Sequence, residues 1–156
     1  MQSIANSLIE AGLCPLPCKM PEKRPAVPSW TKYQKERPQP GDHNYSDGIG
    51  LVTGLISNLI VIDLDIKYDI SGTLWQRFKE AVHLWDSIER KAYIQKTINN
   101  GYHVFIRCEE IGGNKKIASR MATSEELAKN PGEKAKCIIE TRENGGFIVI
   151  APTPGY

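Results

Sequence analysis

The chain has 156 residues, of which 40% are hydrophobic and 24% are charged, and its formal net charge is +2. This length suits one domain, with room for two lobes but not for two large independent cores. The composition is ordinary for a globular protein, and the mild charge excludes a nucleic-acid-binding protein recognisable by charge alone, although it is compatible with a local basic groove.

The N-terminal segment predicts a short helix over residues 3–12. Ser3 is a candidate N-cap, and Gly12 is a stop signal. The segment has no basic n-region and carries Glu10 within its apolar part, so it does not resemble a signal peptide. Because the chain also has no run of about 18 apolar residues, we expect no membrane contact. We expect a cytoplasmic protein, or one of the host cytoplasm if the gene is viral or plasmid-encoded.

An arm over residues 14–40 follows and holds most of the ten prolines, so we expect neither a long helix nor a central strand in it. Trp30 and Tyr33 give it apolar anchors, which favours an ordered, extended arm over a disordered linker. Cys14 and Cys18 have a spacing compatible with zinc, but no second cysteine or histidine pair completes a four-ligand site. Reduced cytosolic thiols are therefore the simplest interpretation.

The core is predicted to begin near Gly48. Residues 49–53 predict a short strand, and residues 56–66 carry the strongest strand signal, an apolar run that passes into the alternation Asp-Leu-Asp-Ile. Residues 73–90 predict one amphipathic helix, because apolar side chains recur there every three or four positions.

The second half of the core predicts more strands than helices. The expected elements are a hairpin of strands 93–97 and 102–107, an irregular basic segment over 109–122, a helix capped at Thr123 and running to Lys129, and a second hairpin of strands 137–142 and 147–151.

This order of elements predicts an α+β fold with helices on one face of a mostly antiparallel sheet, for which a ferredoxin-like or RRM-like sheet is the natural candidate. We expect a single domain over residues 1–156. Within it, residues 1–47 would form the N-terminal helix and arm, and residues 48–152 would form the core.

Asp63 and Asp65 are the first candidates for a functional site. Residues two apart in a strand point to the same face, so the two carboxylates share one face while Ile62, Leu64 and Ile66 share the other. Neighbouring carboxylates repel each other and are costly to bury, and a divalent cation such as Mg²⁺ resolves both problems. The alternative is a solvent-exposed face with surface aspartates, which the apolar run before them disfavours.

Glu140 is a candidate third carboxylate, because it lies in a predicted strand with Ile138 and Arg142 on the same face. It would complete an acidic triad if its strand neighbours that of Asp63. Two interpretations stay open: a metal ligand, or an edge-strand glutamate paired with Arg142 or a lysine.

His103 follows a turn and alternates with Phe105 and Arg107, so it can project at the rim of the sheet. It could donate to a substrate phosphate or be a structural, hydrogen-bonded histidine, and taken alone this position favours the structural role. We interpret His83, in the predicted helix, as structural and His43, in a loop, as solvated.

Several catalytic classes lack their motifs in this chain. The glycine-rich segment 48–54 matches neither a Walker nor a Rossmann fingerprint, and G-x-S-x-G is absent. Cys108 and Cys137 have no base nearby in sequence. A P-loop ATPase, a Rossmann dehydrogenase and a hydrolase with a side-chain nucleophile are therefore not supported.

A set of motifs occurs in a fixed order along residues 15–152. They are an arm with Lys23, Arg24, Pro25 and Trp30, a strand between Gly48 and Gly54, the pair Asp63 and Asp65, the segment Asn100 to Phe105 with His103, and a final stretch with Glu140, Thr141, Arg142, Gly145, Gly146, Phe147, Ala151 and Pro152. Taken together, they resemble the primase–polymerase (prim-pol) domains of the archaeo-eukaryotic primase superfamily.

The resemblance implies a two-lobed domain with an RRM-like catalytic sheet. It implies template-directed nucleotidyl transfer in nucleic-acid replication, by a DNA primase, a DNA polymerase or both. Asp63, Asp65 and Glu140 would be catalytic and would bind two divalent metal ions, Mg²⁺ or Mn²⁺. His103 would contact the phosphates of the incoming NTP or dNTP.

The resemblance also implies contacts with the other substrates. Arg142 and Lys23 are candidates for binding nucleotide phosphates or the template, and the basic residues within 107–120 are candidates for following the template backbone. The partners would be a single-stranded DNA template and a primer.

The chain departs from the family pattern at several points. Glu140 stands where aspartate is frequent, and Asn99 and Asn100 stand where Ser-Gly is frequent. The chain ends at Tyr156, before further motifs of the family, so we expect a fragment of a longer protein, which in this family often carries a helicase domain.

Two other functions are weighed against this one. The first is a non-catalytic, RRM-like module that binds single-stranded nucleic acid, which is disfavoured because acids stand where stacking aromatic residues would be needed. The second is a metal-dependent nuclease that uses the same acidic triad.

Overall fold

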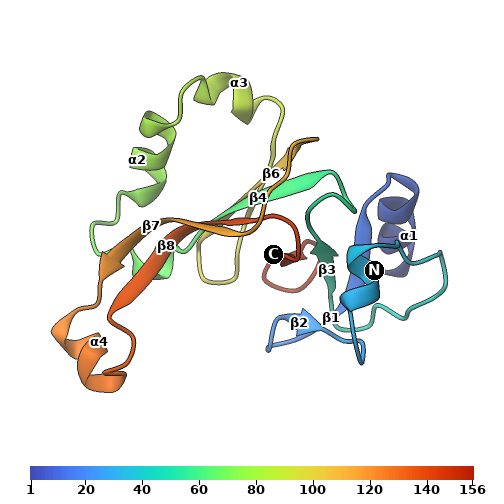
Figure 1. Cartoon of the computed structure of the whole chain (residues 1–156), viewed down its shortest axis with the longest axis horizontal. Coiled ribbons are helices and arrows are strands. Elements are labelled where there is room, and N and C mark those ends of the chain that lie inside the picture. The colour runs from blue at the N-terminus through green and yellow to red at the C-terminus, as the bar shows by residue number, and fades with distance from the viewer.

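In the computed structural model, which describes residues 1–156, the strands form two sheets that lie side by side (Figure 1). The first sheet, in the order β2-β1-β3-β9, consists of β1 (Cys14–Lys19), β2 (Arg24–Pro25), β3 (Ile49–Val52) and β9 (Phe147–Ile150). The second sheet, in the order β5-β6-β4-β8-β7, consists of β4 (Leu59–Leu64), β5 (Tyr93–Lys96), β6 (Tyr102–Arg107), β7 (Lys115–Met121) and β8 (Ala135–Arg142). Neighbouring strands are antiparallel throughout, and the predicted α+β class is confirmed.

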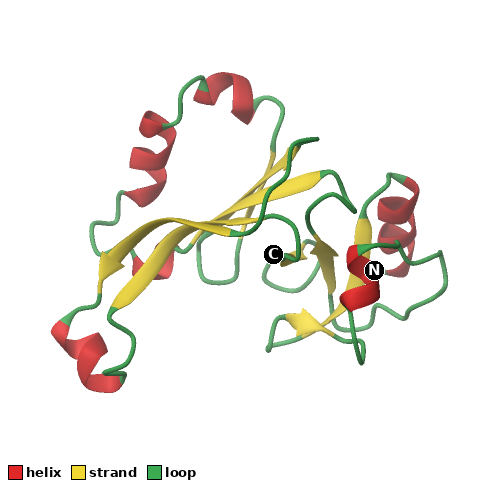
Figure 2. Ribbon diagram, viewed as in Figure 1, coloured by secondary structure: helices red, strands yellow, loops and turns green.

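The helices lie outside the two sheets (Figure 2). They are α1 (Gln2–Glu10) beside the first sheet, α2 (Leu74–Ala81) and α3 (Trp85–Glu89) on one face of the second, and α4 (Ser124–Lys129) at the far end of β7 and β8, together with the 3₁₀ turns η1 (Thr31–Gln34) and η2 (Ile66–Tyr68). None of the helices is long and apolar enough to cross a membrane.

β1 is a central strand of the first sheet, which corrects the expectation that the proline-rich arm holds none. The amide of Cys18 donates to the carbonyl of Gly48 (2.9 Å), so alternate residues of β1 direct their N–H groups toward β3. Pro15 and Pro17 are the intervening residues, and their nitrogens lie on the outer side, where β2 does not pair. The Pro17 carbonyl accepts from the Ala26 amide there. Prolines are tolerated because they occupy only positions that need no donor.

The helix predicted over residues 73–90 is two shorter helices, α2 and α3. Leu84, between them, has φ of 60°, a left-handed conformation that an α-helix cannot include. The break changes the direction of the chain (Figure 1), so both pieces can follow the twisted sheet. The rings of Phe78 and Trp85, one from each helix, lie 5.5 Å apart in the same apolar cluster.

Two expectations about the C-terminal half are also wrong. The segment 109–122 is not irregular throughout, because β7 lies within it and pairs with β8, with register shifts on either side of Ala118. β8 and β9 form no hairpin, since β9 pairs with β3 in the first sheet. Their connection bends at Gly145 (φ 74°), and the Asn144 side chain accepts from the Leu55 amide (2.8 Å). The chain thereby crosses between the sheets. The β5–β6 hairpin and the Thr123 capping box are as predicted.

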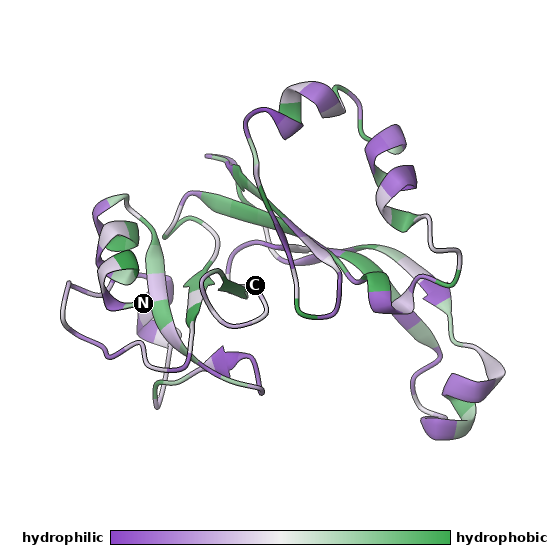
Figure 3. Ribbon diagram, turned by 180° about the vertical axis from the view of Figure 1, so that it is seen from behind, coloured by the Kyte–Doolittle hydropathy of each residue, from purple (hydrophilic) through white to green (hydrophobic).

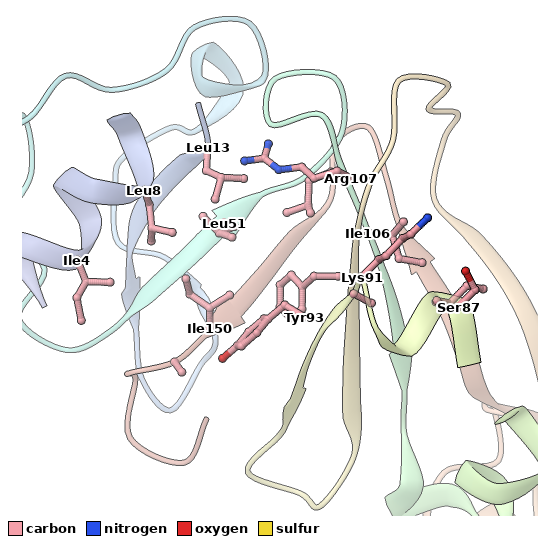
Figure 4. A pocket seen from close by; sticks show the side chains of 15 residues that line it. Ile4, Leu8, Leu13, Leu51, Ser87, Lys91, Tyr93, Ile106, Arg107 and Ile150 are labelled. Atoms are coloured by element: carbon pink, nitrogen blue, oxygen red, sulfur yellow. The ribbon is translucent and has the colours of Figure 1, made fainter. Parts of the chain in front are cut away.

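Hydrophobic residues recur along strands of both sheets (Figure 3). One cluster lies between the sheets and includes Ile49, Val61 and Phe105, and another joins the second sheet to α2 and α3. Beside the first cluster, an apolar cavity of about 740 Å³ opens between α1, the first sheet and the β5–β6 side of the second (Figure 4). Leu8 and Tyr93 face each other across it.

Candidate active site

The three middle strands of the second sheet bring the main candidate residues side by side. Asp63 on β4 lies opposite His103 on β6 and, on its other side, opposite Glu140 on β8. Directly opposite residues of an antiparallel pair share a face of the sheet, so the three side chains form a row across three strands. The adjacency of the Asp63 and Glu140 strands, which the sequence left open, is therefore established.

This row continues to both edges of the second sheet. Gln95 on β5 lies opposite His103, and Lys116 on β7 lies opposite Glu140. We refer to Gln95, His103, Asp63, Glu140 and Lys116 as the transverse row.

The transverse row faces the first sheet rather than the helices. Val61, two residues before Asp63 on β4, packs in the cluster between the sheets, whereas Leu64 packs with the helices. A polar cavity of about 190 Å³ lies over the middle of the row. Its lining residues are Lys23, Asp63, Asp65, Lys67, Thr97, Asn99, His103, Arg142, Phe147, Ile148, Val149 and Tyr156.

Asp63 is the most strongly perturbed carboxyl group of the site. Burial raises its pKa to about 6, and the negative charges of Asp65 and Glu140 contribute in the same direction. Arg142 opposes this effect, with its Nη2 atom 3.7 Å from the Asp63 carboxylate. Burial is therefore the main reason that the charged form of Asp63 is disfavoured.

His103 is held in one tautomer by a chain of hydrogen bonds. The Ala151 amide donates to Gln95 Oε1 (3.2 Å), which fixes the orientation of the Gln95 amide group. Gln95 Nε2 then faces His103 Nδ1 (3.0 Å) and also donates to the Val149 carbonyl (2.9 Å). Because Nδ1 receives a donor, the ring proton is assigned to Nε2.

The His103 ring carries no charge at neutral pH. Burial lowers its pKa to about 3, with further contributions from the charges of Lys23 and Arg142. Its Nε2 atom lies 3.6 Å from an Asp63 oxygen, too far for a hydrogen bond, and with a neutral ring the contact is not an ion pair. His103 Nε2 therefore faces Asp63 at the cavity without a hydrogen bond between them.

Arg142 connects the two carboxylates of neighbouring strands. The same Nη2 atom that approaches Asp63 hydrogen-bonds Oε1 of Glu140. A second cation, Lys67, lies 3.4 Å from the Asp65 carboxylate. No group of three or more histidine, cysteine, aspartate or glutamate side chains is arranged as a metal-binding cluster.

The structure brings the predicted site residues together at one place. Asp63, Asp65, His103, Arg142 and Lys23 all line the polar cavity. Glu140 does not line it but lies beside it, joined to Asp63 through Arg142.

Lys23 reaches the cavity from the first sheet. It lies in the tight turn between β1 and β2, where it adopts a φ of 56°, and its amide donates to the Lys19 carbonyl. Its Nζ atom lies 5.4 Å from the centroid of the Tyr156 ring, which in turn lies 5.9 Å from the His103 ring. Both halves of the molecule thus contribute to the site.

Sequence analysis missed Gln95, Lys67 and Tyr156. Gln95 carries no motif, and only its cross-strand position opposite His103 reveals that it orients the ring. Lys67 could have been found from its position two residues after Asp65, since the two side chains form an ion pair. Tyr156 lies far from the other residues in sequence and gave no signal.

One comparison with known proteins found a family match. A family model described as "Bifunctional DNA primase/polymerase, N-terminal" matches residues 5–155, nearly the whole chain. No curated protein matches the chain in sequence.

Proposed function

The chain belongs to the family of bifunctional DNA primase/polymerase N-terminal domains, and from this premise we propose that it performs template-directed nucleotidyl transfer with divalent metal ions at the polar cavity. The substrates are NTPs or dNTPs, with a single-stranded DNA template and a primer end. One observation carries the proposal: Asp63 lies opposite His103 on one strand and opposite Glu140 on the other.

The residues in and beside the cavity fit divalent cations by the chemistry of their donors. Asp63 and Asp65 in the cavity and Glu140 beside it offer carboxylate oxygens, which Mg²⁺ and Mn²⁺ prefer. Asp63 is mostly buried and has a pKa raised to about 6, so added positive charge beside it would be strongly favourable. Bound at these carboxylates, the metal ions would activate the primer hydroxyl and offset charge on the leaving pyrophosphate.

The remaining residues bind and orient the nucleotide. The Nε2–H of His103 donates to a phosphate oxygen of the nucleotide, and it does so as a neutral donor because the pKa of the ring is depressed to about 3. Lys23 and Arg142 add charge-assisted contacts to the triphosphate. The primer 3′ oxygen forms the new bond to the α-phosphorus as the bond to the β-phosphate oxygen breaks and pyrophosphate departs.

A synthesis assay tests this function. The protein is incubated with single-stranded DNA, with or without a primer, with all NTPs and dNTPs and with Mg²⁺ or Mn²⁺. We expect labelled extension products that need metal, and a fall of more than about 100-fold in Asp63→Asn, which keeps the shape of the side chain but not its charge. Asp86→Asn, on the exposed surface of α3, is the matched control and should behave as the wild type.

The other outcomes identify different functions. Undiminished synthesis by Asp63→Asn would contradict the proposal. Shortened strands instead of extended ones would indicate a nuclease that uses the same carboxylates. Metal-independent strand binding with neither product would indicate a binding module.

A further inference from the structure

The transverse row is buried at one edge of the second sheet and exposed at the other. Gln95 and His103 are each 5% exposed, the Asp63 and Glu140 side chains are 14% and 22% exposed, and Lys116 is exposed. The row therefore has a closed end at β5 and an open end at β7.

The closed end is sealed by the segment that carries β9. Gln95 bonds both the carbonyl of Val149 and the amide of Ala151, so backbone lies directly over this end of the row. The polar cavity lies over the middle of the row, since its lining includes His103 and Asp63 but not Gln95, Glu140 or Lys116. A small molecule can occupy such a cavity, but a polymer that continues in both directions needs the open end.

Lys116 is the uncompensated cation at the open end. Glu140, opposite it, is bonded to Arg142 instead, and no carboxylate oxygen lies within 4 Å of the Lys116 ammonium group. Arg120 is paired with Glu126 and Lys136 with Glu133. Lys115 is unpaired like Lys116, but it lies opposite Thr141 and not opposite a residue of the transverse row, so Lys116 is the unpaired cation of the row.

We propose that Lys116 binds a backbone phosphate of the nucleic-acid strand, which crosses the open end of the transverse row at the edge strand β7, beside Glu140. The inference rests on the proposed function and adds to it the side from which the polymer approaches. The incoming nucleotide occupies the polar cavity, with Lys23 and Arg142, and the strand lies at the open end of the row, beside Glu140.

The neighbouring residue supplies a matched control. Lys115 is also exposed and lies on the same strand, but it lies opposite Thr141, one position along β8 from Glu140. Because neighbouring residues of a strand point to opposite faces, Lys115 points away from the transverse row. Lys115→Gln and Lys116→Gln change the net charge equally and differ only in the face from which a charge is removed.

The test measures binding of a labelled single-stranded DNA by fluorescence anisotropy over a series of KCl concentrations. For Lys116→Gln we expect a several-fold weaker affinity at low salt and a reduction of about 0.7 in the slope of log K against log salt, the value for one lost phosphate contact on a single strand. Lys115→Gln and Lys116→Arg should retain the wild-type slope, and the KM for the nucleotide should be unchanged in Lys116→Gln.

Three results would overturn the inference. They are an unchanged slope in Lys116→Gln, an equal loss in both glutamine variants, and no measurable strand binding by the wild type. Binding is measured without catalysis, so failure here is distinct from failure of the proposed function, which is decided by Asp63→Asn in the synthesis assay.

Discussion

Two cavities lie along the same strands of this molecule and differ in nearly every respect. The larger, about 740 Å³, is lined by 12 hydrophobic residues out of 15, and the smaller, about 190 Å³, is lined mainly by charged and polar groups. β4 and β6 contribute to both, with Leu59 and Phe105 in the apolar cavity and Asp63 and His103 in the polar one.

The residues on this face of the strands change from apolar to polar over two positions, which is one repeat of a β-strand. Val61 and Phe105 face each other in the β4–β6 register, and two residues further along the same face Asp63 and His103 do so. At the apolar end, burial of hydrophobic surface stabilises the packing of the two sheets. At the polar end, charged groups are held away from water, which lowers the free energy of unfolding. We therefore base the proposed site on the placement of desolvated charge and not on the size of a cavity.

The largest effect on stability is expected at the apolar end. Phe105 is 7% exposed, contacts the Tyr93 ring at 5.4 Å and belongs to the cluster between the sheets. Phe105→Ala should lower the free energy of unfolding by about 3 kcal/mol, measured by urea denaturation, because it removes buried area and enlarges an existing cavity. A loss below about 1 kcal/mol would show that this cluster does not hold the sheets together.

Removal of a charge at the polar end should raise the free energy of unfolding, in contrast to the loss expected for Phe105→Ala. In metal-free buffer, Asp63→Asn should be more stable than the wild type at pH 7. Burial raises the pKa of Asp63 to about 6, whereas an unfolded chain has a value of about 3.9. The folded state thus binds the proton more tightly, and the wild type loses stability as pH rises from about 4 through about 6.

The expected gain has a defined pH window. The difference in unfolding free energy between Asp63→Asn and the wild type should be near zero at pH 4 and should reach about 2–3 kcal/mol at pH 7, measured by urea denaturation with EDTA. His103 is present in both proteins, so its own titration cancels in the difference. A difference that does not vary between pH 4 and pH 7 would contradict the raised pKa. Added Mn²⁺ should stabilise the wild type and not the variant.

The sequence predicts the features of this contrast that depend on local structure, but not those that depend on pairing between distant segments of the chain. Alternation along each strand separated Asp63 from Leu64 and His103 from Val104, because side-chain direction in a strand is a local property. That Asp63 and His103 share one face depends on the pairing of β4 with β6, which the sequence analysis did not predict. That Glu140 joins them depends on β8 lying beside β4, which is a long-range pairing with no local signal.

The wrong and missing predictions also concern features that are decided by contacts between distant parts of the chain. Prolines were expected to exclude a central strand, but only the direction of each nitrogen decides this, and Pro15 and Pro17 both direct theirs away from β3. The turn at Gly145 looked like a hairpin, although its backbone carries the chain from one sheet to the other. Gln95 was missed because its role exists only in its contacts with His103 and Ala151.

The smallest effect is expected at Gln95, a buried residue that orients the His103 ring of the polar cavity. Gln95→Met has nearly the same length but gives no donor to His103 Nδ1. We expect the wild-type ring to carry its proton on Nε2 alone in ¹⁵N NMR spectra, and the variant to show a mixture of tautomers. The KM for the nucleotide should rise about threefold to tenfold, or about 1 kcal/mol, with a smaller change in kcat.

The pair of readouts separates orientation from mere packing. Gln76→Met, at an exposed position on α2 where the side chain bonds only Glu80, is the control and should change neither the spectrum nor the KM. If Gln95→Met lowered stability but left the tautomer and the KM as they are, Gln95 would be a structural residue, and the Nε2 donor of His103 would be set by other contacts. If the tautomer and the KM change together, the hydrogen bonds that close the β5 end of the transverse row also prepare its nucleotide-binding group.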